Sequence, residues 1–201
     1  MGQLEWMARG ATLAALGLAT VAFQYFAWRA CRTEAVTPRH LLREEGAWFT
    51  VVFVLLTTLI TLGVLGFATG APWLAPTMIA MPAAVEAAGA LLALAGAAGI
   101  AWTMATLRDN HTITTVTRAE HQLVTTGPYR WVRHPLYAFA LLMCIGFTLA
   151  TGSLLVAAAT LAGLPLGRVR MEREEAALVE RFGDRYKEFM ARRGRLWPRA
   201  L

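Results

Sequence analysis

The sequence has little charge, and what it has is unevenly placed. Charged residues make up 16% of the 201 residues and hydrophobic residues 57%, whereas a typical soluble domain has about 25% charged residues. No residue in the range 46–85 is charged, and neither is any in the range 135–167. Apolar runs of this length argue against an ordinary soluble domain and indicate lipid as the main solvent.

Cysteine and lysine are also scarce. The only two cysteines, Cys31 and Cys144, form no CxxC pair and have no histidine at ligand spacing, which argues against a zinc site or a disulfide framework. With Lys187 as the only lysine, the formal charge of +6 is carried almost entirely by arginine. These arginines lie between and after the apolar runs, so we expect them to face lipid headgroups, with no nucleic acid and no metal bound.

Five apolar segments predict an all-α membrane fold with about five transmembrane helices. Turn residues separate the segments: Gly70-Ala71-Pro72 and Pro76 interrupt the second run, and Thr151-Gly152-Ser153 divides the last run into a tight hairpin. The arms of this hairpin are short, so they cross the full bilayer only if the helices continue past the flanking charges. The predicted helices cover about residues 11–28, 48–69, 77–107, 136–150 and 154–166.

The distribution of arginine predicts the orientation in the membrane. Arginines follow the first and third segments and fill the tail from Arg168, whereas the loops at 70–76 and 151–153 carry no charge. The positive-inside rule then places the N-terminus outside and the tail in the cytoplasm, in a bacterial or archaeal inner membrane. We expect one domain over residues 1–201: three helices in 1–107, a cytoplasmic motif loop in 108–135, the hairpin in 136–167 and a cytoplasmic amphipathic tail in 168–201.

The motif loop ends in a group of residues suited to binding an anion. Gly127-Pro128 is a turn signal, and Pro135 suits the first turn of a helix. Arg133 and His134 would then flank a helix N-terminus, whose free backbone donors attract anions. The alternative is an interfacial loop whose aromatic residues anchor it and whose arginines face lipid headgroups.

The tail contains an acid at a position where its pattern requires an apolar residue. Met171, Glu175, Leu178 and Phe182 share one helical stripe, so Glu175 needs a partner if that stripe is packed. Arg170 and Glu174 have the i,i+4 spacing of a simple ion pair. We expect the helix to break near Gly183-Asp184.

Two further charged features have simpler interpretations. The run Arg192-Arg193-Gly194-Arg195 is expected to contact anionic lipid headgroups. Glu86 lies in the third helix near its outer end, where a polar helix contact or a snorkelling side chain is the preferred interpretation.

Two stretches of the sequence resemble the signatures of the isoprenylcysteine carboxyl methyltransferase family, over about residues 95–198. The first is His121-x-Leu123-Val124-Thr125-Thr126-Gly127-Pro128-Tyr129-Arg130-x-x-Arg133-His134-Pro135-x-Tyr137. The second is Arg170-x-x-x-Glu174-Glu175-x-x-Leu178, followed by Phe182-Gly183-x-x-Tyr186. The chain departs from the family at Phe139, where members often have glycine.

This resemblance implies a membrane methyltransferase that uses S-adenosyl-L-methionine and acts on a lipid-like or prenylated acceptor, as a carboxyl O-methyltransferase. Arg170 would hold the acceptor carboxylate, Arg133 is a second candidate for holding an anion, and Glu175 could receive the ammonium of the cofactor. The residues implied to line the cofactor site are His121, Leu123, Val124, Gly127, Tyr129, His134, Pro135, Tyr137, Glu174 and Glu175.

Two other classes of function stay open at this point. Sterol reductases share a similar C-terminal half, but they usually have more helices and carry Asn where this chain has Pro135-Leu136. A membrane protein that keeps the fold only as a binding or assembly module is the other alternative, although the intact set of Arg170, Glu174 and Glu175 argues against it.

Overall fold

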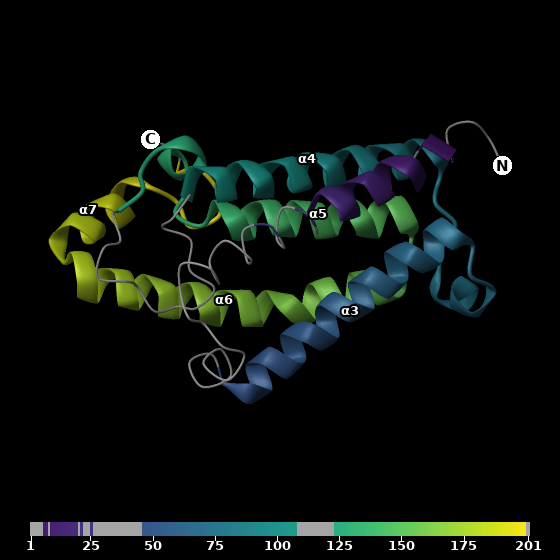
Figure 1. The fold of residues 1–201 in the computed structure, drawn as a ribbon, viewed down its shortest axis with the longest axis horizontal. Coiled ribbons are helices and arrows are strands. Elements are labelled where there is room, and N and C mark those ends of the chain that lie inside the picture. Colours follow the sequence, from purple (N-terminus) through teal and green to yellow (C-terminus); the bar gives the residue numbers. More distant parts are fainter. Residues whose placement is uncertain are drawn as a thin grey trace.

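The computed structural model describes residues 6–7, 9–19, 21, 25, 46–107 and 123–199, and it is helical apart from short connections. Residues 9–19 are helical and overlap the first predicted segment, which begins at about residue 11. The named elements that follow are α3 (Ala47–Thr69), η1 (Pro72–Thr77), α4 (Ala83–Leu107), η3 (Gly127–Arg130), α5 (Pro135–Thr151), α6 (Leu154–Phe182) and α7 (Asp184–Arg192). In Figure 1, α4 and α5 lie side by side, α3 crosses α6, and α7 lies at the end opposite the N-terminus.

The order of the helices confirms the sequence prediction, and two of the bounds differ from it. Helix α4 begins at Ala83 instead of near Thr77, because the 3₁₀ helix η1 extends to Thr77 and residues 78–82 are not helical. Pro82 lacks the backbone N–H that a helix begun at Thr77 would need at that position. Helix α6 runs without a break to Phe182, far past the apolar run, so the second arm of the hairpin is long enough to cross a bilayer.

Small residues bring α4 and α5 into backbone contact. A Cβ atom on Gly96 would lie 2.6 Å from the backbone nitrogen of Met143, and one on Gly146 would lie 2.7 Å from the carbonyl oxygen of Gly89. Close approach over small residues is the usual packing of helices in lipid, where dispersion contacts replace the hydrophobic effect. The central core takes residues from five helical segments: Ala15, Val64, Ala93, Ala97, Phe147 and Val156.

The turn between α5 and α6 confirms the predicted hairpin. Gly152 has φ +60°, which ends α5 in the left-handed region. The hydroxyl of Ser153 accepts a hydrogen bond from the backbone N–H of Val156 and so caps α6. The N–H of Ile79 donates to the carbonyl of Gly152 at 2.9 Å, which fixes the turn against the segment before α4.

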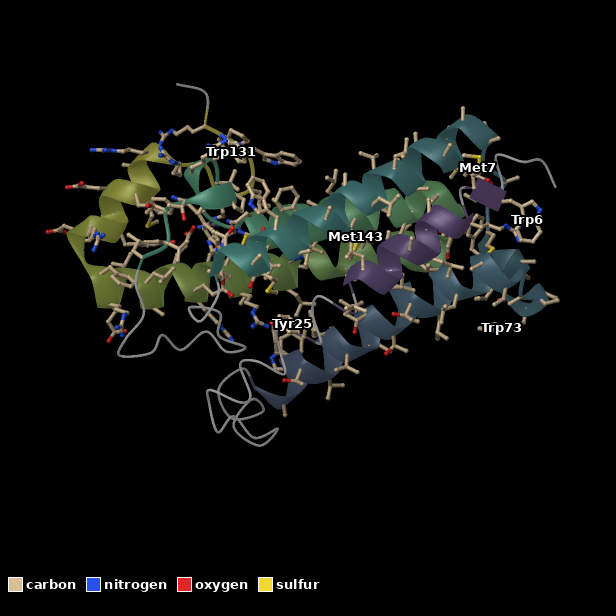
Figure 2. The ribbon with its side chains drawn as sticks, turned by 45° about the horizontal axis from the view of Figure 1, so that its top comes forward. Trp6, Met7, Tyr25, Trp73, Trp131 and Met143 are labelled. Carbon is tan, nitrogen blue, oxygen red and sulfur yellow. The ribbon has the colours of Figure 1, made fainter. Side chains whose placement is uncertain are left out.

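The molecule has an apolar end and a polar end. Three helices, α3, α4 and α6, are long and apolar enough to cross a membrane, and α5 is a shorter apolar helix. Many large apolar side chains on these helices are exposed, such as Val51, Phe53 and Leu91, as expected of lipid-facing surfaces in an integral membrane protein. Figure 2 shows nitrogen and oxygen atoms gathered near α7, at the end that also bears Trp131, with Trp6 and Trp73 at the opposite end.

Candidate active site

Glu175 lies at the centre of the polar end. Its side chain is buried, on the charged part of α6. The guanidinium of Arg195 donates from Nη2 to Oε2 at 2.6 Å and from Nε to Oε1 at 3.2 Å. Oε1 also lies 3.0 Å from Nε2 of His134 and 3.2 Å from Nε of Arg133. The acid on the packed stripe therefore has its partners, as burial requires.

Glu174, the next residue on α6, forms a second set of contacts. Its Oε1 accepts a hydrogen bond from the hydroxyl of Tyr137 at 2.5 Å and another from Nε of Arg170 at 3.3 Å. Its Oε2 lies 3.6 Å from Nδ1 of His134. The i,i+4 pair expected from the sequence exists, but it is one contact in a network that joins α5 to α6.

His134 connects the two carboxylates, since each of its ring nitrogens faces one of them. Burial alone would lower the pKa of His134, but the hydrogen bonds and negative charges of Glu174 and Glu175 outweigh burial and raise that pKa. Folding therefore favours the protonated form of His134 relative to the unfolded chain.

The raised pKa of His134 predicts a pH dependence of stability. The pKa of His134 is higher in the folded than in the unfolded chain, so its protonated form contributes to the free energy of unfolding. This contribution is complete below the unfolded pKa of about 6.5 and is lost as pH rises through the folded pKa. We expect the melting temperature in detergent to fall by a few degrees across this interval. His134→Gln should flatten the profile, and an unchanged slope in that variant would contradict the assignment.

Tyr186 places a hydroxyl in the same region. Its side chain is 1% exposed, and its hydroxyl has no hydrogen-bond partner in the described parts of the chain. Burial, with the nearby charge of Glu175, raises the pKa of Tyr186. The group thus stays a neutral donor that no described residue uses.

Tyr137, which is half-buried, and Tyr186, which is buried, are expected to respond differently to loss of the hydroxyl. Tyr137→Phe removes a charge-assisted hydrogen bond to Glu174 and should cost about 2 kcal/mol. Tyr186→Phe removes a hydroxyl without a described partner, so stability should stay the same or rise. Melting temperatures of the two variants test this contrast, and equal losses would show that Tyr186 has a partner of comparable strength.

Backbone pairing brings the end of the chain onto the motif loop. The N–H of Arg133 donates to the carbonyl of Gly194 at 2.9 Å, and the N–H of His134 donates to the carbonyl of Arg195 at 3.0 Å. The N–H groups of these two residues, which flank the N-terminus of α5, are therefore not free to bind an anion. They donate instead to the carbonyl groups of residues 194–195, which belong to the segment that follows α7.

The remaining predicted site residues lie along the approach to α5. Leu123 and Val124 are half-buried, and Pro135 is buried at the first position of α5. Tyr129 lies in η3, where burial and the charge of Glu174 raise its pKa. Gly127 has φ +57°, and a Cβ there would lie 2.6 Å from Oγ1 of Thr106, so glycine allows η3 to dock on α4. His121 lies outside the described residues.

The two interpretations of the motif loop apply to different residues. Arg130 stacks on Trp131 at 4.1 Å, and Trp131 packs edge-on against Trp102 at 5.6 Å. Both tryptophans are largely exposed, as interfacial anchors would be. Arg133 and His134 point inward, so only the first part of the loop fits the interfacial interpretation.

Sequence reasoning missed two contributors to this site. Arg195 was assigned to lipid headgroups, yet it contacts Glu175 and also lies 3.5 Å from Glu172. Phe49 of α3 is buried, and the guanidinium of Arg170 lies 5.8 Å from its ring centroid. The one local signal was Gly194, where a Cβ would collide with the carbonyl oxygen of Trp197. A glycine required by a tight turn indicates an ordered tail.

Comparison with known proteins finds a matching family model, a curated relative and similar solved structures. The model of the isoprenylcysteine carboxyl methyltransferase (ICMT) family matches residues 89–180. A protein-S-isoprenylcysteine O-methyltransferase of Xenopus laevis is 36% identical over 81 residues, which are 40% of this chain and 28% of that protein. The solved structure of the eukaryotic intramembrane Ras methyltransferase ICMT without a monobody has a TM-score of 0.61 at 20% identity, covering 98% of this chain and 68% of that one.

These matches differ in how much of the chain they cover and in what they show. At 20% identity the structural match shows a shared fold. The sequence match spans little more than a quarter of the length of the Xenopus protein. The family match includes α5 and the glutamates of α6 but ends before α7 and the residues that follow it.

Proposed function

We propose that this chain, whose residues 89–180 match the model of the isoprenylcysteine carboxyl methyltransferase family, is an integral membrane methyltransferase that uses S-adenosyl-L-methionine. The proposed reaction is carboxyl O-methylation of a lipid-like or prenylated acceptor. The observation that carries the proposal is the network of Arg133, His134, Tyr137, Glu174 and Glu175, built around the buried His134 and Glu175 at the polar end of the helical bundle.

The side chains at this end fit the cofactor chemically. S-adenosylmethionine carries an ammonium and a sulfonium, for which carboxylates and tyrosine hydroxyls are suitable partners, and a carboxylate, for which arginine is suitable. The hydroxyl of Tyr186, which has no partner among the described residues, is available to donate to a ligand. The proposed cofactor site consists of residues 121–127 with Tyr129, His134, Pro135 and Tyr137, completed by Glu174 and Glu175.

When bound, S-adenosylmethionine supplies an electrophilic methyl group. Arg170 is proposed to orient the acceptor carboxylate, which is ionised at neutral pH and needs no base. Arg170 suits this role because it lies where the start of α3 meets the charged part of α6, held by Glu174 and Phe49. Arg133 is the second candidate for an anion. The chain's contribution is to align the two reactants and exclude water.

Activity and binding measurements on one variant test the role of Arg170. Purified protein with lipid restored should bind S-adenosylmethionine by calorimetry and methylate S-farnesylcysteine. Arg170→Gln should raise KM for the acceptor at least about tenfold, as expected for a lost charge-assisted pair, and change the Kd of the cofactor less than about twofold. The control is Arg173→Gln, an exposed residue one position from Glu174, which should match the wild type.

Well-folded wild-type protein that binds no S-adenosylmethionine would overturn the proposed function. Binding of NADPH by the same preparation would support the reductase alternative. Binding of neither would support the non-enzymatic one.

The proposed orientation places the polar end in the cytoplasm and the N-terminus outside, in a bacterial or archaeal inner membrane. It rests on the uncharged loops at one end and the arginines at the other. The proposed domain is a single unit over residues 1–201, in which residues 168–201 close the cofactor site from the cytoplasm.

Two single-cysteine variants distinguish the two possible orientations. Exposed Ala75 and Lys187, changed singly to cysteine in a chain without its natural cysteines, test the orientation. An impermeant maleimide applied to intact cells should label only Ala75→Cys.

A further inference from the structure

The segment after α7, residues 193–199, forms a strap across the site. Gly194 pairs with Val132 as an isolated parallel bridge, and the carbonyls of Gly194 and Arg195 accept the N–H groups of Arg133 and His134. Nη1 of Arg133 donates to the carbonyl of Met190 at 3.1 Å. The strap is therefore attached to the residues that contact Glu175.

We propose that Arg195 is a positioning residue, which acts through Glu175 to hold the cofactor site in its binding geometry. This inference rests on the proposed function and extends it to a part of the chain beyond the family match, which ends at residue 180.

The first argument is the form of the contact between Arg195 and Glu175. Two nitrogens of one guanidinium meet the two oxygens of one carboxylate, at 2.6 and 3.2 Å. Such a fork restricts both the position and the rotation of the carboxylate. If Arg195 only contacted a mobile lipid headgroup, it would need neither this two-point geometry nor a strap that backbone hydrogen bonds hold in place.

The second argument is the connection between Arg195 and His134. The carbonyl of Arg195 holds the backbone N–H of His134, while its guanidinium holds Glu175, and the ring of His134 contacts both glutamates. One residue of the strap thus fixes the residue that precedes α5 and a residue of α6 relative to each other. Loss of its side chain should loosen the alignment of the two helices at the site.

The test compares Arg195→Gln and Arg195→Lys with the control Arg192→Gln, an exposed arginine in the last turn of α7. Arg195→Gln should raise the Kd for S-adenosylmethionine at least tenfold and leave KM for S-farnesylcysteine within twofold. Arg195→Lys should recover part of this loss, since lysine keeps the charge but not the fork. Arg192→Gln should bind as the wild type does.

A second measurement needs no cofactor, so it separates failure of this inference from failure of the proposed function. Hydrogen exchange of the amides of Arg133 and His134, which donate into the strap, should be at least tenfold faster in Arg195→Gln than in the wild type or Arg192→Gln. Unchanged exchange would overturn the inference, whether or not the protein binds S-adenosylmethionine. Faster exchange with cofactor affinity equal to the wild type would also overturn it, because Arg195 would then only stabilise the tail.

Discussion

Glu175→Ala is expected to abolish detectable binding of S-adenosylmethionine and to destabilise the fold by about 3 kcal/mol, because removing one partner of a buried pair leaves the other charges uncompensated. The remaining groups are Arg133, Arg195 and His134, of which His134 is almost fully buried. Since the Arg195 side chain is 34% exposed and can partly rehydrate, the cost should be at the lower end of the range for buried pairs. Calorimetry and thermal unfolding measure the two effects.

Two related variants separate charge from shape. Glu175→Gln keeps the volume and an acceptor oxygen, so it should retain more stability than Glu175→Ala but bind the cofactor weakly. Glu180→Ala removes an exposed glutamate from the same helix. Surface substitutions usually change stability by less than about 0.5 kcal/mol, so this control should be nearly neutral. A Glu175→Ala variant that matched Glu180→Ala in both measurements would remove Glu175 from the site.

The need of Glu175 for a partner could be predicted from the sequence, but the partner could not. The helical stripe shared with Met171 follows from a period of 3.6 residues, and both side chains are buried. Arg195 lies twenty residues later, beyond the break at Gly183 and the whole of α7. No local spacing rule reaches across such a turn. The contact depends on where the strap returns, which the backbone pairing with Arg133 determines.

The way in which the fold accommodates Phe139, where the sequence departs from the family, also could not be predicted from local sequence. Its ring packs directly on Gly99 of α4, where a Cβ atom would collide with it. A large residue on α5 is thus accommodated by the absence of a side chain on α4. Each helix could be predicted separately from its apolar run, but this pairing depends on how α4 and α5 align along their lengths. That alignment is a tertiary property, so neither segment contains it.

Gly146→Ala is expected to destabilise the protein strongly, although helix propensity alone predicts the opposite. In an exposed helix, alanine is favoured over glycine by about 1 kcal/mol. At Gly146, however, the added Cβ would lie 2.7 Å from the carbonyl oxygen of Gly89 and 2.8 Å from Cα of Ala93. Both are backbone atoms that no rotamer change can move, so α4 and α5 must separate along the face that includes Ala93, Phe147 and Ala150.

The steric cost should prevail, because overpacking a core costs about 1–3 kcal/mol and more where backbone must shift. Gly163 of α6 provides the matched control: a Cβ there would meet only Cδ1 of Leu56, at 3.8 Å, which is ordinary contact. Gly163→Ala should therefore raise the melting temperature in detergent while Gly146→Ala lowers it, and Gly146→Leu should yield no folded protein. If Gly146→Ala were as stable as Gly163→Ala, the close contact of α4 and α5 would be wrong.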